Sequence, residues 1–341
     1  SSYIILEGGI FLKKKIIIVI ICLITIAVVT LFLIKTHVKK ENTSLTKIKL
    51  AEVTHSSFYA PLYVAKEKGF FEEEGLDVEL ILTPGADKVS AAVLSNDVEI
   101  GFAGAESAIY VYEQEESDYL QLFAGLTKRD GQFIVARNNY ENFTLEDLYG
   151  KEILVGRSTG MPALNFLNAL KNNNIDIDKI NVNYSVEFAA LSGTFIGGTG
   201  DFVNLFEPNA TALEKEGYGQ VVASVGMMSG EVPYTAFYAR KSYIEENQDV
   251  IKSFTNAINK AINYTMNNDS TIVAEDIIAQ FPDTDVSDLA LMIDRYKEYD
   301  CWLESSFISE EIFTNLEDFL IDFELLEQYV PYNDLVNNFY E

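Results

Sequence analysis

The sequence predicts an α/β protein built from two lobes. From residue 48 onward, short apolar segments that suit strands alternate with helical segments, and the alternation starts afresh near residue 131. Such alternation is typical of an open, mostly parallel sheet with helices on both faces. A length of 341 residues also fits two domains of roughly 100–200 residues each.

The charge of the chain is strongly acidic and unevenly distributed. Its 25 Lys and Arg face 52 Asp and Glu, a net charge of −27, which disfavours nucleic acid as a partner because phosphate recognition needs concentrated positive charge. Apolar residues make up 48% of the chain, as in a packed globular protein. Residues 1–46 hold six Lys against two Glu, a net of +4, so the remainder carries −31.

The N-terminal region predicts a membrane anchor. Ile16–Ile34 has nineteen residues without a charge, nearly enough for a helix to cross a bilayer core of about 30 Å. The lysine cluster 13–15 places the amino end, 1–15, in the cytoplasm, so that 35–46 becomes a linker to an extracytoplasmic domain at the cell membrane. A cleaved signal peptide and lipidation at Cys22 remain alternatives, and residues 1–11 are a candidate overcall of the translation start.

The first lobe is expected to comprise 47–130 together with 231–341. Its predicted strands are 48–53, 78–83, 99–103, 120–126 and the returning strand 234–239, and its predicted helices are 59–68, 86–94 and 106–114. Long amphipathic helices follow at 250–266, 272–280, 289–299 and 310–326. Apolar residues recur along the first of these at helical spacing: Ile251, Phe254, Ile258, Ile262 and Met266.

The second lobe is expected to comprise 131–230. Its predicted strands are 133–136, 152–156, 182–184, 202–205 and 221–225, and its predicted helices are 162–172, 187–194 and 209–215. The chain therefore crosses between the lobes twice, which predicts a hinge.

Motifs for enzyme chemistry are scarce. The chain has two histidines, His37 and His55, and two cysteines, Cys22 and Cys301, without metal-ligand spacing. It contains no phosphate-binding loop of the P-loop type. We therefore expect neither an enzyme nor a cofactor or metal site.

Polar and aromatic residues gather where predicted strands end, which is the edge at which open α/β sheets bind ligands. The candidate ligand-binding residues are His55, Ser57, Phe58 and Tyr59 after the first strand, Glu106 after the third, Arg157, Ser158 and Thr159 at a helix start, Phe206 and Glu207 after strand 202–205, and Tyr234, which opens the returning strand.

From residue 47 to its end, the chain resembles the substrate-binding proteins of ABC importers in the group that handles sulfonates, nitrate and the thiamine pyrimidine precursor. The most specific segment is SFYAPLYVAKEKGFFEEEGLDV at 57–78, supported by DVEIGFA at 97–103, LYGK at 148–151 and FEP at 206–208. The resemblance implies a type II periplasmic-binding-protein fold, a small-molecule ligand held between two lobes, hinge closure, and delivery to a membrane permease with a cytoplasmic ATPase. It also favours a monomer.

The candidate residues favour a particular ligand class. They include one cation, Arg157, against the two carboxylates Glu106 and Glu207, and their aromatic side chains suit stacking, to which Tyr184 and Phe188 could add. This pattern fits a neutral or weakly basic N-heterocycle such as the thiamine pyrimidine precursor. A binder of sulfonate, taurine or nitrate, an enzyme like the pyrimidine-precursor synthase, and a tethered sensor domain are the alternatives. The single tryptophan, Trp302, is expected in the core of the first lobe, with a cap over the ligand cleft as the alternative.

Overall fold

The computed structural model describes residues 44–115, 117–158 and 160–339. The predicted membrane segment 16–34, its flanks 1–15 and 35–43, and the candidate residue Thr159 lie outside these ranges. Within the described ranges, no helix combines the length and the apolar character that crossing a membrane requires.

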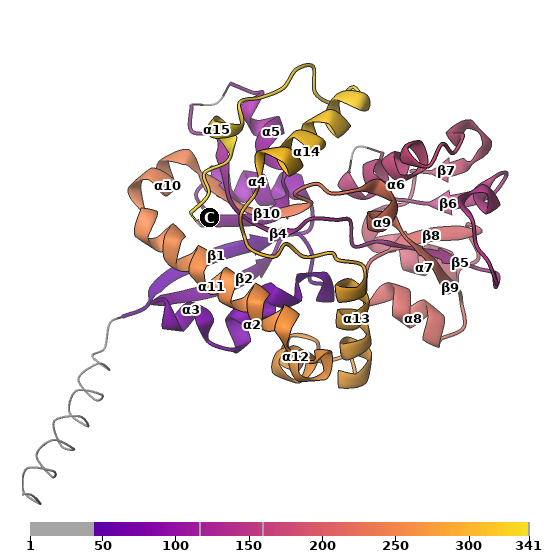
Figure 1. Cartoon of the computed structure of the whole chain (residues 1–341), viewed down its shortest axis with the longest axis horizontal. Coiled ribbons are helices and arrows are strands. Elements are labelled where there is room, and N and C mark those ends of the chain that lie inside the picture. The colour runs from indigo at the N-terminus through magenta and orange to yellow at the C-terminus, as the bar shows by residue number, and fades with distance from the viewer. Residues whose placement is uncertain (1–43, 116, 159, 340–341) are drawn as a thin grey trace, which may run out of the picture. The chain divides into compact units, whose positions relative to one another are not determined.

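The first sheet has five strands in the order β2-β1-β3-β10-β4 (Figure 1). Its strands are β1 (Thr46–Glu52), β2 (Leu76–Leu82), β3 (Ile100–Gly104), β4 (Leu120–Thr127) and β10 (Thr235–Arg240). β1 pairs in parallel with β2 and β3, whereas the returning strand β10 runs antiparallel between β3 and β4.

The second sheet repeats this plan in the order β7-β6-β8-β5-β9. Its strands are β5 (Phe133–Ala136), β6 (Glu152–Leu154), β7 (Asn181–Asn183), β8 (Phe202–Leu205) and β9 (Gln220–Ser224). Here β5, the strand that enters the lobe, is the antiparallel one, between β8 and β9. We refer to the first sheet with its helices as lobe 1 and to the second sheet with its helices as lobe 2; both belong to one compact unit that begins at Thr46.

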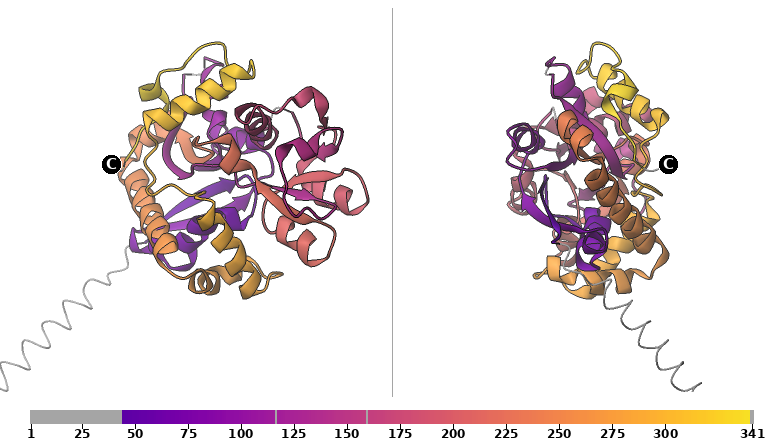
Figure 2. Two further views of the ribbon diagram at one scale, coloured as in Figure 1. Left: turned by 45° about the vertical axis from the view of Figure 1, so that its right-hand side comes forward. Right: turned by 90° about the vertical axis from the view of Figure 1, so that its left-hand side faces the viewer.

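Helices cover both sheets (Figures 1 and 2). Those of lobe 1 are α2 (Ala60–Glu67), α3 (Phe70–Glu73), α4 (Ala86–Leu94), α5 (Glu106–Tyr112), α10 (Lys241–Glu246), α11 (Gln248–Asn267), α12 (Ser270–Ile277), α13 (Val286–Glu298), α14 (Glu310–Asp322) and α15 (Tyr332–Leu335). Those of lobe 2 are α6 (Met161–Asn172), α7 (Leu191–Ile196), α8 (Asn209–Lys215) and α9 (Val225–Ser229). Short 3-10 turns lie at η1 (Ser57–Tyr59), η2 (Leu145–Leu148), η3 (Ile177–Lys179), η4 (Phe188–Ala190) and η5 (Ile278–Gln280).

Most predicted helices shift by a few residues in the structure, and two of them show differences with a clear cause. The helix expected at 187–194 is a 3-10 turn followed by α7, which begins at Leu191. The helix expected at 310–326 ends at Asp322, because Glu324 adopts a left-handed backbone with φ of 57°, which stops the right-handed helix.

The amphipathic helix α11 supplies much of the lobe 1 core. Phe254 packs its ring 5.0 Å from Phe71, 5.1 Å from Phe237 and 5.7 Å from Phe123. The other predicted core residues of this helix, Ile251, Ile258 and Ile262, are buried. Met266 is 38% exposed, contrary to the spacing argument, and it lies one residue before the end of the helix.

The two chain crossings between the lobes bind each other. Val232 donates its backbone N–H to the carbonyl of Lys128 at 3.0 Å, and Tyr234 donates to Thr127 at 3.0 Å. Gly226, in α9, lies against the first crossing so closely that a Cβ placed on it would be 2.1 Å from the carbonyl oxygen of Asp130. Only a glycine allows this approach.

We therefore expect Gly226→Ala to lower the free energy of unfolding by about 1–3 kcal/mol, because a methyl group would force a backbone carbonyl of the crossing to move. Urea denaturation measures this change. Gly193→Ala is the matched control, since Gly193 is also helical and a Cβ on it would meet no atom within 4 Å. A Gly226→Ala protein as stable as the control would show that the crossing tolerates the displacement.

Candidate functional site

Four of the predicted site residues form an aromatic cluster where the lobes meet. The ring of Phe58 lies 5.3 Å from Tyr59, 5.3 Å from Phe206 and 5.9 Å from Tyr234. Phe58 and Tyr59 follow β1 in lobe 1, Phe206 follows β8 in lobe 2, and Tyr234 precedes β10. We call Phe58, Tyr59, Phe206 and Tyr234 the aromatic cluster; its members come from both sheets.

Contacts within lobe 1 fix the position of Phe58 in this cluster. Trp302 is buried and donates its indole N–H to the carbonyl oxygen of Phe58 at 2.7 Å. Tyr296 of α13 places its ring 5.1 Å from that of Phe58. Gly131 lies against Phe58, since a Cβ on it would be 2.5 Å from the ring. Phe188, from η4 of lobe 2, reaches Phe206 at 5.7 Å, whereas Tyr184 packs in the separate core of lobe 2.

Glu106 presents a buried carboxyl group beside the aromatic cluster. It is the first residue of α5, directly after β3, and it is 5% exposed. Gly104 makes room for it, because a Cβ at Gly104 would lie 2.0 Å from Oε2 of Glu106. That oxygen has no hydrogen-bond partner among the described residues. Burial raises the pKa of Glu106 to about 8, and the opposing contribution comes from its own backbone rather than from a cation.

Asp130 is a second buried carboxyl group, on the first crossing between the lobes. Its Oδ1 accepts the backbone N–H of Gln132 at 2.6 Å, and its Oδ2 accepts Nε2 of Gln132 at 2.9 Å. Burial raises the pKa of Asp130 to about 7, although hydrogen bonds from Gln132 and Tyr234 oppose the shift. The sequence interpretation did not select Asp130. The rule that selected Glu106, a polar residue just after the end of a strand, could have selected Asp130 as well, because Asp130 comes shortly after β4.

Glu106 and Asp130 both act on the tyrosines of the aromatic cluster. Burial is the largest cause of the raised pKa of Tyr59 and of Tyr234, and both carboxyl groups add to it in each case. Tyr59 is also within 3.4 Å of the hydroxyl of Thr235. The junction of the lobes therefore combines aromatic rings with two carboxyl groups in surroundings that exclude water.

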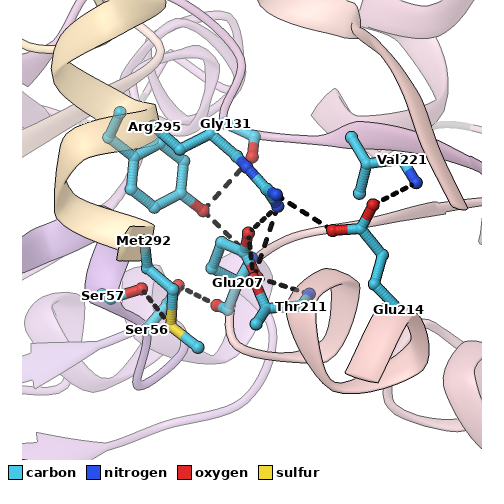
Figure 3. A network of polar contacts seen from close by, with 10 residues as sticks. Ser56, Ser57, Gly131, Glu207, Thr211, Glu214, Val221, Met292 and Arg295 are labelled. Atoms are coloured by element: carbon cyan, nitrogen blue, oxygen red, sulfur yellow. Dashed lines mark hydrogen bonds and ion pairs between the residues drawn. The ribbon is translucent and has the colours of Figure 1, made fainter. Parts of the chain in front are cut away.

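Glu207 joins lobe 2 to lobe 1 through its backbone and its side chain (Figure 3). Its backbone N–H lies 3.0 Å from the hydroxyl of Tyr296, and its carbonyl oxygen accepts the hydroxyl of Ser56 at 2.6 Å. Its carboxylate accepts Nη1 of Arg295 at 2.5 Å and both the N–H and the hydroxyl of Thr211, at 2.8 and 2.9 Å.

Arg295 also contacts a second lobe 2 carboxylate, since its Nη2 lies 2.9 Å from Oε2 of Glu214. Burial raises the pKa of Glu207, against the lowering that Arg295 and Thr211 produce. Both carboxylate oxygens of Glu207 are thus engaged within the chain, and its predicted contact with ligand stays a prediction. Arg295 was not recognised in the sequence because α13 lies 88 residues farther along the chain.

His55 and Ser57 contact other parts of lobe 1. Nδ1 of His55 lies 2.8 Å from a carboxylate oxygen of Glu52, and Nε2 lies 2.9 Å from the carbonyl oxygen of Gln280. Since both partners are acceptors, the protonated ring satisfies both by donating from each nitrogen. Ser57 is buried and donates its hydroxyl to the sulfur of Met292 at 3.7 Å.

The remaining predicted residues are exposed or lie outside the described ranges. Arg157 is two-thirds exposed and pairs with the equally exposed Glu187 at 3.0 Å. Ser158 is exposed, and Thr159 lies outside the described residues. The described part of the chain also holds no group of three or more His, Cys, Asp or Glu side chains arranged to bind a metal ion.

The contacts of His55 predict a pH-dependent contribution to stability. The hydrogen bond to Glu52 raises the pKa of His55 above 6.5, outweighing burial. The stabilisation is therefore complete below pH 6.5, where the imidazole is protonated even in the unfolded chain, and it is lost as the pH rises through the higher folded pKa. Urea denaturation of the wild type and of His55→Asn at several pH values should show a gap that shrinks with rising pH. If the difference in the free energy of unfolding between the two proteins does not change with pH, the hydrogen bonds of His55 do not depend on its protonation.

The contacts of Arg295 predict a strong dependence of folding on this side chain. Arg295→Met leaves the Glu207 carboxylate buried without its cation, and we expect a loss of about 3–5 kcal/mol in the free energy of unfolding. Lys215→Met is the control, because Lys215 of α8 pairs with Asp288 of α13 at the surface. We expect this control to lower the free energy of unfolding by less than about 1 kcal/mol. Equal losses for the two variants would contradict the role of Arg295.

Comparisons with known proteins agree with this architecture. The family described as "NMT1/THI5 like" matches residues 56–272. "Putative binding protein YtlA" of Bacillus subtilis is 42% identical over 299 residues, which cover 87% of this chain and 90% of that protein. "Putative thiamine biosynthesis protein" of Haemophilus influenzae is 28% identical over 162 residues, 46% of this chain and 50% of that protein.

Among solved structures, the alkanesulfonate-binding protein SsuA from Xanthomonas axonopodis pv. citri, bound to MOPS, superimposes with a TM-score of 0.67 at 16% identity. The superposition covers 86% of this chain and 98% of that protein, which shows a shared fold and confirms the predicted α/β periplasmic-binding-protein architecture. The family match covers more than half of the chain, and the relative from Bacillus subtilis covers most of it. The chain therefore belongs to the NMT1/THI5 like family.

Proposed function

We propose that this protein is the extracytoplasmic substrate-binding component of an ABC importer. In this proposal it captures a small nutrient between its two lobes and delivers it to a membrane permease driven by a cytoplasmic ATPase. Membership of the family and the shared fold support binding and delivery. In the same proposal the uncharged segment 16–34 anchors the protein to the membrane, and the acidic domain of residues 47–341 acts as a monomer outside it.

The ligand we propose is an amino-substituted N-heterocycle resembling the thiamine pyrimidine precursor. The observation that carries this choice is the buried carboxyl group of Glu106, one oxygen of which has no partner among the described residues. Glu106 is close enough to Tyr59 and Tyr234 of the aromatic cluster to raise their pKa values. With a pKa of about 8, Glu106 is mainly protonated at pH 7. A protonated carboxyl group matches an aminopyrimidine edge, because its O–H donates to the ring nitrogen while its carbonyl oxygen accepts the amino group.

A sulfonate or nitrate ligand is less compatible with these residues. An anion requires donors and usually a cation. Arg157 is exposed and paired, and Arg295 is engaged by two carboxylates, while Glu106 and Asp130 bring potential negative charge to the aromatic cluster. An enzyme or a sensor remains the alternative if no nutrient binds.

Isothermal titration calorimetry tests the ligand class. We expect hydroxymethylpyrimidine, 4-amino-5-hydroxymethyl-2-methylpyrimidine, to bind the wild-type protein and taurine not to bind. Tight binding of taurine, with no response to the pyrimidine, would reverse this assignment.

Substitutions at Glu106 test the contact itself. Glu106→Leu removes two hydrogen bonds and should weaken pyrimidine binding by about 10- to 1000-fold. Glu106→Gln keeps one donor and one acceptor, so it should bind more tightly than the leucine variant. Affinity of the wild type should fall as the pH rises through about 8, where Glu106 ionises, whereas the glutamine variant should lack this dependence. Equal affinities of the three proteins would remove Glu106 from the site.

A further inference from the structure

Two buried side chains of lobe 2 carry polar atoms that nothing else in the described chain binds. The Nδ2 and Oδ1 atoms of Asn204 and the Oε1 atom of Gln132 have no hydrogen-bond partner among the described residues. Both side chains are 0% exposed. A buried polar group without a partner destabilises the folded state, so folding alone does not explain why these atoms are buried.

These two side chains lie on the same face of the lobe 2 sheet. Ile134 of β5 stands opposite Asn204 of β8, and Gln132 is two residues before Ile134, so strand alternation puts all three on one face. Ile134 and Phe202 pack in one core with Phe166 of α6, which identifies this face as the one that α6 covers. Asn204 and Gln132 are therefore diagonal neighbours at the end of the sheet that meets lobe 1.

The orientation of the Gln132 amide is fixed by its surroundings. Its Nε2 donates to Oδ2 of Asp130 at 2.9 Å and to the carbonyl oxygen of Pro162, in the first turn of α6, at 3.0 Å. Since both partners accept, the nitrogen must face them, and Oε1 is left as an acceptor. Asp130 thus acts as a positioning residue that holds Gln132 in this orientation.

These groups connect to the site already described. Gln132 follows Gly131, where a Cβ would lie 2.5 Å from the ring of Phe58. Asn204 is two residues before Phe206, another member of the aromatic cluster.

We infer that Asn204 and Gln132 form a ligand subsite, the amide subsite, that recognises an uncharged group able both to donate and to accept a hydrogen bond. A hydroxyl group fits, because its oxygen accepts from Nδ2 of Asn204 while its proton goes to Oε1 of Gln132 or to Oδ1 of Asn204. A sulfonate, which only accepts, leaves both amide oxygens unpaired. This inference rests on the proposed function, since it assigns the second end of the same heterocyclic ligand.

The experiment compares two ligands and three proteins by calorimetry. The ligands are hydroxymethylpyrimidine and its analogue with a methyl group in place of the hydroxymethyl group. The proteins are the wild type, Asn204→Leu, which has similar volume without polar atoms, and the control Ser229→Ala. Ser229 carries another buried hydroxyl without a partner among the described residues, but it ends α9.

We expect the wild type to bind the hydroxymethyl compound about 10- to 100-fold more tightly than the methyl analogue. Asn204→Leu should lose most of this difference while binding the methyl analogue as the wild type does, and its midpoint of thermal unfolding without ligand should not fall. Ser229→Ala should keep the full difference.

The outcomes distinguish failure of the amide subsite from failure of the proposed function. If the pyrimidine binds, but the wild type does not distinguish the two ligands or Asn204→Leu keeps the discrimination, the amide subsite is wrong and the proposed function stands. If neither pyrimidine binds the wild type, the ligand class fails and the inference fails with it. Should Asn204→Leu not fold, the comparison of the two ligands on the wild type still decides, since equal affinity overturns the subsite.

Discussion

The attachment of Glu207 to lobe 1 is the interaction on which the junction of the two lobes depends. Ser56 and Tyr296 bind the backbone of Glu207, and Arg295 binds its carboxylate (Figure 3). All three partners belong to lobe 1, whereas Glu207 lies two residues after the end of β8 of lobe 2. Because lobe 1 binds both the backbone and the side chain of Glu207, Phe206 immediately before it lies against Phe58. The aromatic cluster therefore forms from residues of two lobes that are far apart in the sequence.

The same junction brings carboxyl groups into surroundings that disfavour their charge. Glu106 and Asp130 are almost fully buried and have raised pKa values because water is excluded. Glu207 is equally buried but has an arginine partner, which Glu106 lacks among the described residues. The sequence alone had assigned both carboxylates to one predicted site. In the structure Glu207 joins the lobes, whereas Glu106 has one oxygen without a partner among the described residues.

Much of the fold was predictable from local patterns. The bounds of α4, β5, β8 and α8 match the predicted segments, because each is a short apolar or amphipathic run that local sequence patterns record. The candidate site was only partly predictable. The rule that ligands bind where parallel strands end selected Phe58, Tyr59, Phe206 and Glu106, which the structure places at the lobe junction, but the same rule selected Arg157, which lies on the surface.

The sequence by itself determined most of the succession of strands and helices and the acidic character of the domain, since these follow from residue order and composition. Its resemblance to known proteins indicated the family. Only the tertiary structure decided which polar side chains have partners. Arg295 contacts Glu207, which lies 88 residues earlier in the chain. Asp130 accepts a hydrogen bond from Nε2 of Gln132, which leaves Oε1 of Gln132 as an acceptor. Whether a carboxylate or an amide is engaged depends on side chains brought together by packing, and local sequence patterns do not record such distant contacts.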